Sequence, residues 1–582
     1  MWRSPAFFQE FLNEQGLVGN LYDAIEKDDL SDAVIVALDI LKKTNNIPPL
    51  VKDVKCKSKS STYRQQGNKE YKIGKYQKAL ESYNKALKFA PKGSEELVFA
   101  YSNRSALLAT CKMFQACLND IETCFALGCP TQITDKLSKR REESLKCLWM
   151  ERMTSEIRYS EYAEQYLDFI ERRNPQIGCA STDVGVIIES HVPKVVAIRD
   201  VKVGKVIARE KAFVSQLDRK YKYSACYYCH QMNFNLIPCE TCCSALFCDE
   251  DCMQTCLEEY HGVECHIVEI FDELSSIPVP KLSVNAAIKF RNECESWEEF
   301  NEATSSLGLK RMKESEINDI FDGDNKLSLL NFRDDAPFKF GMVYNNSFGC
   351  AMVLHYLGKV DSFLPSRSAE KVAAVRGFCR LLMYFALNLT HTQILSTYSV
   401  MAPGRTEFSD VANFGVFPFT GKLKGACNPN VLVLGLNDEV ALIALQPLKP
   451  GMELTIAHLG HWMDNNIEIS LRWRNMFTLY GTACSCVVCN GDWKLLRQTA
   501  KPTETHLRCL RKLNVKHALE NFCLTEIESL YPKCCKTLAF LSDLPFSNEY
   551  IDVYKLFRKC LLDIQDQCSS NVMLDCSKDE DN

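Results

Sequence analysis

The sequence predicts a multidomain α+β protein with N-terminal helical repeats, a β-rich domain split by a cysteine-rich finger, and a C-terminal helical lobe. Three observations predict this organisation. An amphipathic helix pair recurs between residues 64 and 130, eight cysteines and histidines with metal-ligand spacing fall within 226–265, and alternating β-branched segments lie on both sides of that cluster. With 582 residues, the chain is long enough for about three or four domains.

Composition and charge restrict the classes of protein to consider. The formal net charge is −5, and neither half is strongly basic, so the sequence does not support a nucleic-acid-binding protein. No window approaches the ~18 consecutive apolar residues of a membrane span, and the N-terminal residues are not typical of a signal peptide. We therefore expect no membrane partner and a cytoplasmic or nuclear location, or both. The 30 cysteines are then expected to be reduced thiols or metal ligands.

The helical repeats begin with RQQGNKEYKIGKYQKALESYNKALKFAP, residues 64–91. Small residues Gly67, Ala79 and Ala86 allow two helices to approach closely, and tyrosines fill the groove between them. A second copy follows at 101–130, and residues 131–150 are expected to form a capping helix. The pattern resembles the tetratricopeptide repeat.

Polar side chains on these helices raise the question of peptide binding. Arg64 and Asn68 lie four residues apart on one helix face, as do Lys136 and Arg140, and Asn103 opens the second repeat. They resemble the carboxylate clamp of chaperone-binding repeats, which holds the acidic C-terminal tail of a partner. The alternative is a solvated basic face on helices that only brace the rest of the protein. The sequence leaves both open.

The finger is marked by the spacing C-x2-C-x9-C-x2-C-x5-C-x3-C-x8-H-x3-C over residues 226–265. Each short spacer lets the backbone present two donors to one ion, and tetrahedral zinc takes four, so two zinc ions fit. The segment has little apolar content, and we expect it to unfold without metal. Scattered core cysteines are the alternative. Cys243, Cys256 and His266 fall outside the pattern.

This spacing resembles the MYND finger, and the resemblance implies two interleaved structural sites. The first would use Cys226, Cys229, Cys248 and Cys252, and the second Cys239, Cys242, His261 and Cys265. Members of that family also bind peptides on the finger surface, so peptide ligands are possible partners.

The flanks of the finger extend the resemblance. VVAIRDVKVGKVIAREKAFVSQL, residues 195–217, alternates β-branched and polar residues around a turn at 203–204 and predicts a hairpin. A β-rich segment, 415–460, follows a long helical stretch. From about residue 60 to 490 the chain resembles the SET and MYND domain family of protein lysine methyltransferases, in its tetratricopeptide-bearing branch.

The resemblance implies a third structural zinc site. In KGACNPN, residues 424–430, Cys427 corresponds to a family cysteine that joins a later C-x-C-x2-C, here Cys484, Cys486 and Cys489. Three structural zinc ions are therefore expected.

The cofactor and catalytic positions depart from the family. Lys424 and Gly425 stand where the family has an Asn-His pair that holds S-adenosylmethionine, and a Lys would repel the sulfonium. The Gly-rich cofactor turn falls near residues 191–195, where Lys194 lies and no glycine remains. The resemblance also implies a channel for the substrate lysine that is lined by two tyrosines. His458 stands at the position of one of these tyrosines, and Tyr480 matches the other. Binding of S-adenosylmethionine is therefore doubtful.

The expected domain limits follow from these segments. They are a helical N-terminal region (1–60), repeats with a capping helix (61–150), the first part of the SET domain (181–220), the MYND finger (226–265), a helical insert (266–405), the second part of the SET domain (406–475), a zinc segment (476–490), a helical lobe (491–568) and a disordered tail (569–582).

Three functional hypotheses remain. The preferred one is a catalytically weak or inactive protein that keeps the fold as a protein-interaction scaffold. The second is an active S-adenosylmethionine-dependent protein-lysine N-methyltransferase of histone or non-histone substrates. The third is a chaperone adaptor, in which the repeats do the essential work.

Overall fold

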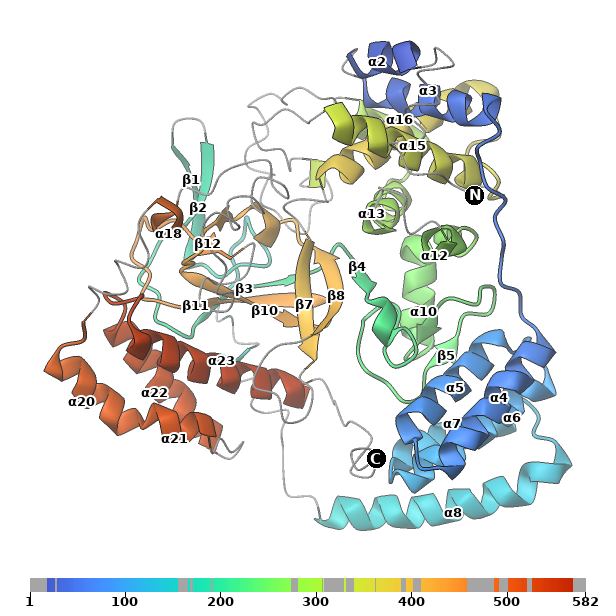
Figure 1. Ribbon diagram of the computed structural model, residues 1–582, viewed down its shortest axis with the longest axis horizontal. Helices are drawn as coiled ribbons and strands as arrows, with labels where there is room; N and C mark the ends of the chain where they lie inside the picture. The colour runs from blue at the N-terminus through green and yellow to red at the C-terminus, as the bar shows by residue number, and fades with distance from the viewer. Residues whose placement is uncertain are drawn as a thin grey trace.

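The computed structural model describes most of the chain. The described residues are 18–26, 29–154, 166–167, 170, 172–189, 192–273, 281–305, 307, 329–330, 340–361, 363–388, 394–400, 410–457, 486–490, 501–520 and 526–568. Helices dominate this part, and the longer strands gather in one β-containing region (Figure 1). None of its helices combines the length and apolar character needed to cross a membrane.

The N-terminal helices α2 (Val18–Glu26) and α3 (Leu30–Lys43) pack against helices from the middle of the chain. Asp29 caps α3 by accepting a hydrogen bond from the amide of Ser31 at 2.8 Å. Arg376 of α16 (Ser368–Asn388) forms an ion pair with Asp32 at 2.8 Å. Residues 44–56, which we call the strap, then lead to the next helical block (Figure 1).

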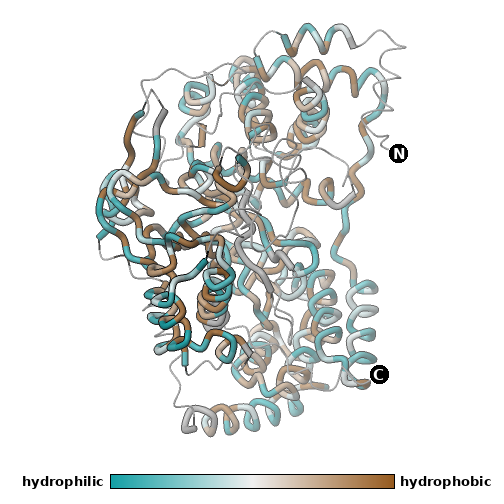
Figure 2. The backbone as a smooth tube through the Cα atoms, turned by 60° about the vertical axis from the view of Figure 1, so that its left-hand side comes forward, coloured by the Kyte–Doolittle hydropathy of each residue, from teal (hydrophilic) through white to brown (hydrophobic). Residues whose placement is uncertain are grey.

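Five consecutive helices occupy the segment where the sequence predicts helix pairs. They are α4 (Lys57–Lys72), α5 (Tyr76–Phe89), α6 (Glu95–Thr110), α7 (Phe114–Ala126) and α8 (Thr131–Thr154). Gly67 is required where α4 meets α5, because a Cβ there would lie 2.6 Å from the Tyr83 ring. Single helices carry both hydrophilic and hydrophobic residues (Figure 2), as amphipathic pairs require.

The β-containing region joins segments from both sides of the finger. One sheet has the order β10-β11-β3 and another β4-β8-β7. In the first, β3 (Val206–Lys211) pairs antiparallel with β11 (Glu439–Ala444), which also pairs with β10 (Val431–Leu436). In the second, β4 (Val214–Leu217) pairs with β8 (Asp410–Val416). Strands before the finger thus depend on partners far after it.

The expected hairpin at 195–217 does not form. Gly204 makes a turn, with φ of +83°, but β2 (Val192–Ala197) pairs with β1 (Val184–Glu189) and β3 pairs with β11. Alternation of β-branched residues specifies a strand and its buried face, not the strand it pairs with. The backbone of the turn bonds instead to residues 444 and 448.

The helices after the finger form one core with it. They are α12 (Glu269–Glu273), α13 (Lys281–Asn292), α14 (Trp297–Thr304), α15 (Phe340–Leu357) and α16. One hydrophobic cluster contains finger residues, these helices and α3. The predicted helical stretch ends before residue 405, because β7 (Ile394–Val400) pairs with β8. The segment ILSTYSV has the β-branched and aromatic residues that favour a strand.

The C-terminal helices pack on the β-containing region. They are α20 (Glu504–Leu513), α21 (Val515–Glu520), α22 (Ile527–Phe540) and α23 (Asn548–Cys568). Their core also contains Val206 and Ile443 from the β10-β11-β3 sheet. Tyr531 donates a hydrogen bond to the carbonyl of Gly204 at 3.0 Å. The turn at Gly204 is therefore held by a helix from the far end of the chain.

Candidate metal centres

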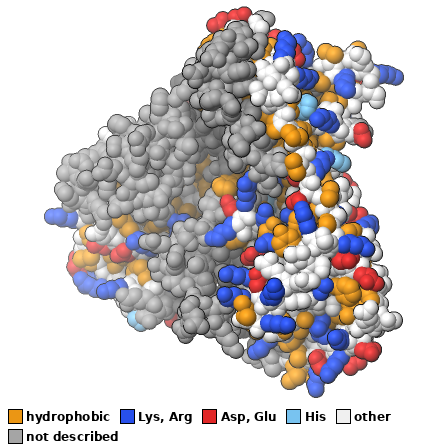
Figure 3. Space-filling view, turned by 45° about the vertical axis from the view of Figure 1, so that its right-hand side comes forward, with side chains coloured by type: hydrophobic (Ala, Val, Ile, Leu, Met, Phe, Trp, Pro, Cys, Tyr) orange, Lys and Arg blue, Asp and Glu red, His pale blue; other side chains and the backbone are white. Residues whose placement is uncertain are grey.

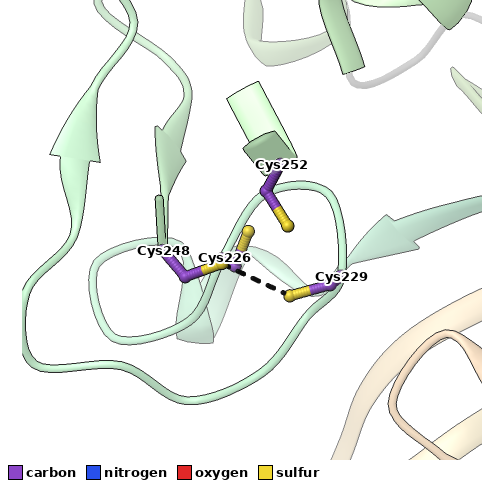
Figure 4. A group of neighbouring side chains, drawn as sticks. All are labelled: Cys226, Cys229, Cys248 and Cys252. Atoms are coloured by element: carbon purple, nitrogen blue, oxygen red, sulfur yellow. Dashed lines mark hydrogen bonds between the residues drawn. The ribbon is translucent and has the colours of Figure 1, made fainter. Parts of the chain in front are cut away.

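Four thiols converge at the first candidate centre (Figure 4). Cys226 and Cys229 lie on a loop, Cys248 follows the short strand β6 (Leu246–Phe247), and Cys252 lies on α10 (Glu250–Cys256). All four sulfur atoms lie within 4.8 Å of one another. Asp249 caps α10 by accepting from the amide of Cys252 at 2.7 Å, which fixes the start of that helix. Four thiolates in this arrangement suit tetrahedral zinc.

The second candidate centre is fully buried and contains Cys239, Cys242, His261 and Cys265. Nε2 of His261 lies 3.6 Å from Sγ of Cys242, and the sulfurs of Cys239 and Cys265 lie 3.9 Å apart. His261 ends a π-helical turn, η2 (Leu257–His261), which α11 (Gly262–Glu264) continues. Three thiolates and one imidazole also suit structural zinc.

A carboxylate that the sequence reasoning missed lies behind this histidine. Glu264 is completely buried, and its Oε2 lies 2.7 Å from Nδ1 of His261. The Tyr227 hydroxyl donates to the same carboxylate, and Lys281 of α13 forms an ion pair with it at 2.8 Å. Burial would raise the pKa of Glu264, but Lys281 and His261 hold it at about 2. The imidazole is thereby oriented with Nε2 toward the thiols.

The third candidate centre is partly described. Sγ of Cys427 lies 3.4 Å from Sγ of Cys489, and Cys486 belongs to the same group. Cys489 lies on α18 (Val487–Asn490), and Cys427 follows the short strand β9 (Lys424–Gly425). Cys484, the expected fourth ligand, lies outside the described residues. Cys427, which lies just before β10, is thus brought together with cysteines about 60 residues further along the chain.

The residues outside the ligand pattern are not drawn into these groups. Burial raises the pKa of Cys243 to about 11 and that of Cys256 to about 12, so both remain neutral thiols near pH 7. His266 is exposed. None of the three belongs to a metal-ligand group found among the described residues.

The expected cofactor positions meet at one edge of the β-containing region. The ammonium of Lys424 lies 2.9 Å from the Glu453 carboxylate, and Lys194 pairs with Glu189. The Lys194–Glu189 bond and charge interaction lower the pKa of Glu189, and nearby Lys424 adds to this. Backbone bonds join these segments, since the amide of Leu454 donates to the carbonyl of Val195 at 2.8 Å. The expected catalytic residues His458 and Tyr480 lie outside the described residues.

The residues expected to bind a peptide tail are only partly assembled. Asn103 donates to the side chain of Asn68 at 2.7 Å, and the Arg64 guanidinium lies over the Phe99 ring. Arg140 instead donates to the carbonyl of Ser102 at 3.0 Å and to the Ser105 hydroxyl at 2.7 Å. Lys136 is exposed on α8. Figure 3 shows that basic and acidic side chains are interspersed on the lower part of this face of the molecule.

Hydrogen bonds also fix these helices to the finger and the residues just before it. Arg104 of α6 and Asp120 of α7 form a buried ion pair at 2.7 Å. Arg104 also donates to the carbonyl of Leu236 at 2.8 Å, and Asn84 of α5 donates to the carbonyl of Tyr223. Helices α5, α6 and α7 therefore contact the finger or the residues just before it.

Comparison with known proteins finds that the chain is similar to several SMYD4 proteins. It is 26% identical over 521 residues to the protein-lysine N-methyltransferase SMYD4 of Danio rerio, covering 78% of this chain and 68% of the relative. The SMYD4 proteins of Mus musculus and Homo sapiens are 23% and 20% identical over 546 and 539 residues, covering 76% and 74% of this chain and 68% and 66% of the relatives. These similarities support the SET and MYND domain family for this chain. No protein-family model matches it.

The chain spans about two thirds of the length of these relatives. The cysteine and histidine clusters fit zinc, and the relatives' named activity implies S-adenosylmethionine. The described residues at the expected cofactor positions match S-adenosylmethionine poorly. They are two lysines that are paired with carboxylates and a glycine without a side chain. Sequence reasoning named Lys194 and Lys424 but missed their acidic partners Glu189 and Glu453, which lie in another strand or loop.

Proposed function

We propose that this chain is a zinc-organised protein-interaction scaffold of the SET and MYND family, with weak or absent methyl transfer. In this proposal α4 to α8 form tetratricopeptide repeats, the β-containing region is a SET domain split by a MYND finger, and α20 to α23 form the C-terminal lobe. Three structural zinc ions hold it together. The pairing of β3 with β11 and of β4 with β8 supports a domain interrupted by the finger.

The scaffold proposal rests on the residues that occupy the expected S-adenosylmethionine positions. Lys424 brings a cation to the place where a sulfonium would lie, and Gly425 offers no side chain. Glu453, the partner of Lys424, is engaged by that lysine, so its charge is not free to attract the donor. The metal-ligand groups, in contrast, are brought together. A protein that keeps its ligands for structural metal but lacks the contacts to S-adenosylmethionine is suited to binding protein partners.

Isothermal titration of the full chain with S-adenosylmethionine tests this proposal. We expect no saturable heat at micromolar donor. A variant that restores the family residues, with Lys424→Asn, Gly425→His and His458→Tyr, should gain binding, and the exposed-site change Lys449→Asn serves as a control. Micromolar binding by the unmodified chain would overturn the proposal. Loss of zinc in the restored variant, checked by elemental analysis, would separate misfolding from failure to bind.

The second candidate is an active protein-lysine N-methyltransferase. The relatives' printed names favour it, and the ion pair with Glu453 offsets the charge of Lys424. Radiolabelled S-adenosylmethionine incubated with histone and non-histone proteins distinguishes the two functions. Transfer to a lysine at a rate similar to that of the SMYD4 relatives would replace the scaffold proposal.

The third candidate is a chaperone adaptor that binds acidic C-terminal tails through the repeats. The hydrogen bond between Asn68 and Asn103 and the nearby Arg64 favour it, whereas the engagement of Arg140 with α6 weakens it. Binding of an acidic tail peptide should fall on Asn68→Ala and not on Gln66→Ala, which lies on the same helix. We propose protein partners and a cytoplasmic or nuclear location, or both, for either function.

A further inference from the structure

The second metal centre lies where three separate parts of the chain meet. The finger supplies Cys239, Cys242, His261 and Cys265. Helix α13 supplies Lys281, whose ammonium lies 2.8 Å from Glu264. The strap supplies Lys55, whose ammonium donates to the carbonyl of Cys239 at 2.6 Å and to that of Lys88, in α5, at 2.9 Å.

The charges at this place are complementary when a divalent ion is bound. Three thiolates leave one net negative charge on such an ion, and Glu264 adds a second. Lys55 and Lys281 supply one positive charge each, so the whole buried group is neutral. A neutral group can be buried at much lower cost than one with unpaired charge. The positions of the two lysines are therefore explained by the negative charge of the metal centre as well as by packing.

We propose that Glu264, Lys281 and Lys55 are positioning residues of the second metal centre. Glu264 accepts from Nδ1 of His261 and so presents Nε2 to the metal, the arrangement that carboxylates commonly provide for zinc-bound histidines. Lys281 holds Glu264, and Lys55 holds the carbonyl of a ligand cysteine. The inference rests on zinc binding at this centre, which the proposed function includes, and goes beyond it in assigning these three residues.

The same contacts couple metal binding to the docking of distant segments. Lys289 of α13 pairs with Glu259 of η2 at 2.9 Å, and Asn292 donates to the carbonyl of Glu259 at 3.0 Å. Because η2 ends at the ligand His261, metal holds the surface on which α13 packs. Loss of metal should therefore release α13 and the strap together, while α20 to α23, which share a different core, keep their packing.

The test uses the full chain with Glu264→Gln, Lys281→Met and Lys55→Met. Glu240→Gln is the matched control, because this exposed residue follows the ligand Cys239 in the sequence but its carboxylate pairs with Lys92 at 2.6 Å. Zinc per chain is measured against a graded chelator, and the cobalt-substituted protein is examined by visible absorption. We expect Glu264→Gln to weaken one zinc equivalent about 10- to 100-fold, to shift the cobalt bands, and to speed hydrogen exchange in α13.

The outcomes separate this inference from simpler ones. Equal zinc affinity and an unchanged cobalt spectrum in Glu264→Gln would overturn it, even if thermal stability falls, since that result marks an ordinary buried ion pair. Lys281→Arg keeps the charge and should restore most of the affinity that Lys281→Met loses, which controls for misfolding. If the unmodified chain retains no zinc, the proposed metal centres fail first, and this inference fails with them.

Discussion

Neutralising Asp120 tests whether a buried ion pair fixes the helical pairs to the finger. Nε and Nη2 of Arg104 donate to the two oxygens of Asp120 at 2.8 and 2.7 Å, and both side chains are almost fully buried. Asn235 of the finger also donates to Asp120, at 2.9 Å. In Asp120→Asn the guanidinium remains buried without its counter-charge.

The structure sets the expected size of this effect. Removing one partner of a buried ion pair costs about 3–5 kcal/mol. Every 1.4 kcal/mol is a factor of about ten in an equilibrium, so local opening should become about 100- to 1,000-fold more frequent. Two-state unfolding is not expected for a multidomain chain, and hydrogen exchange of separate segments is the suitable measurement. We expect faster exchange in α6, α7 and residues 233–240.

Glu122→Gln is the matched control for this experiment. Glu122 lies on the same helix, two residues further on, and pairs with Arg141 at 2.6 Å, but both side chains are about half exposed. Exposed ion pairs contribute about 0–1 kcal/mol, so exchange should change by no more than about fivefold. If Asp120→Asn falls within the range of this control, the buried network does not join the helical pairs to the finger.

Three further predictions concern packing, pH and metal. Gly67→Ala should destabilise α4 and α5 by about 1–3 kcal/mol, because its Cβ would lie 2.6 Å from the Tyr83 ring, whereas Gly19→Ala, with open space around it, should not destabilise; equal melting of the two variants would contradict this. Burial raises the pKa of Asp438 to about 6, so the folded state binds more protons than the unfolded state between about pH 4 and 6. Stability should therefore fall as pH rises through that window, by at most about 1.4 kcal/mol per unit from this group. Asp438→Asn should reduce this slope as measured by hydrogen exchange of β10 and β11, while an unchanged slope would refute the assignment. Chelation of zinc should abolish the protection of residues 226–265 in hydrogen exchange before that of α22 and α23, and simultaneous loss would show that the lobe depends on metal too.

The sequence predicted which cysteines and histidines come together because the spacing that groups them is local. Eight ligands lie within 226–265, and the structure brings them into two groups as the spacing and the family resemblance predicted. A helix pair within residues 64–91 was also expected from periodicity and small residues, and the structure has α4 and α5 there, although α4 begins earlier, at Lys57. In each case the residues that interact are close in the chain, so spacing alone restricts their geometry.

The residues that sequence reasoning missed act through partners far away in the chain. Glu264 pairs with Lys281 from another helix, and the buried charge of Arg104 is satisfied by Asp120, Asn84 and the carbonyl of Leu236. The hairpin at 195–217 was wrong for the same reason, since β3 takes β11 as its partner. Alternation defines the face of a strand, and tertiary contacts choose its neighbour.

The position of the finger in the chain gives its metal an effect beyond its own fold. The finger lies between β4 and β8, which pair with each other, so it sits inside a long loop that folding must close. Closing a long flexible loop costs entropy, and a segment that is already compact reduces the number of free residues in that loop. Metal ligation within 226–265 involves only local contacts and therefore can precede the pairing of β4 with β8. Since the same finger contacts α5, α6, α7 and α13, its ordering brings the helical pairs and the later helices to defined surfaces. This physical role of zinc is the same for a scaffold and for a methyltransferase, whereas the residues at 424 and 425 separate the two.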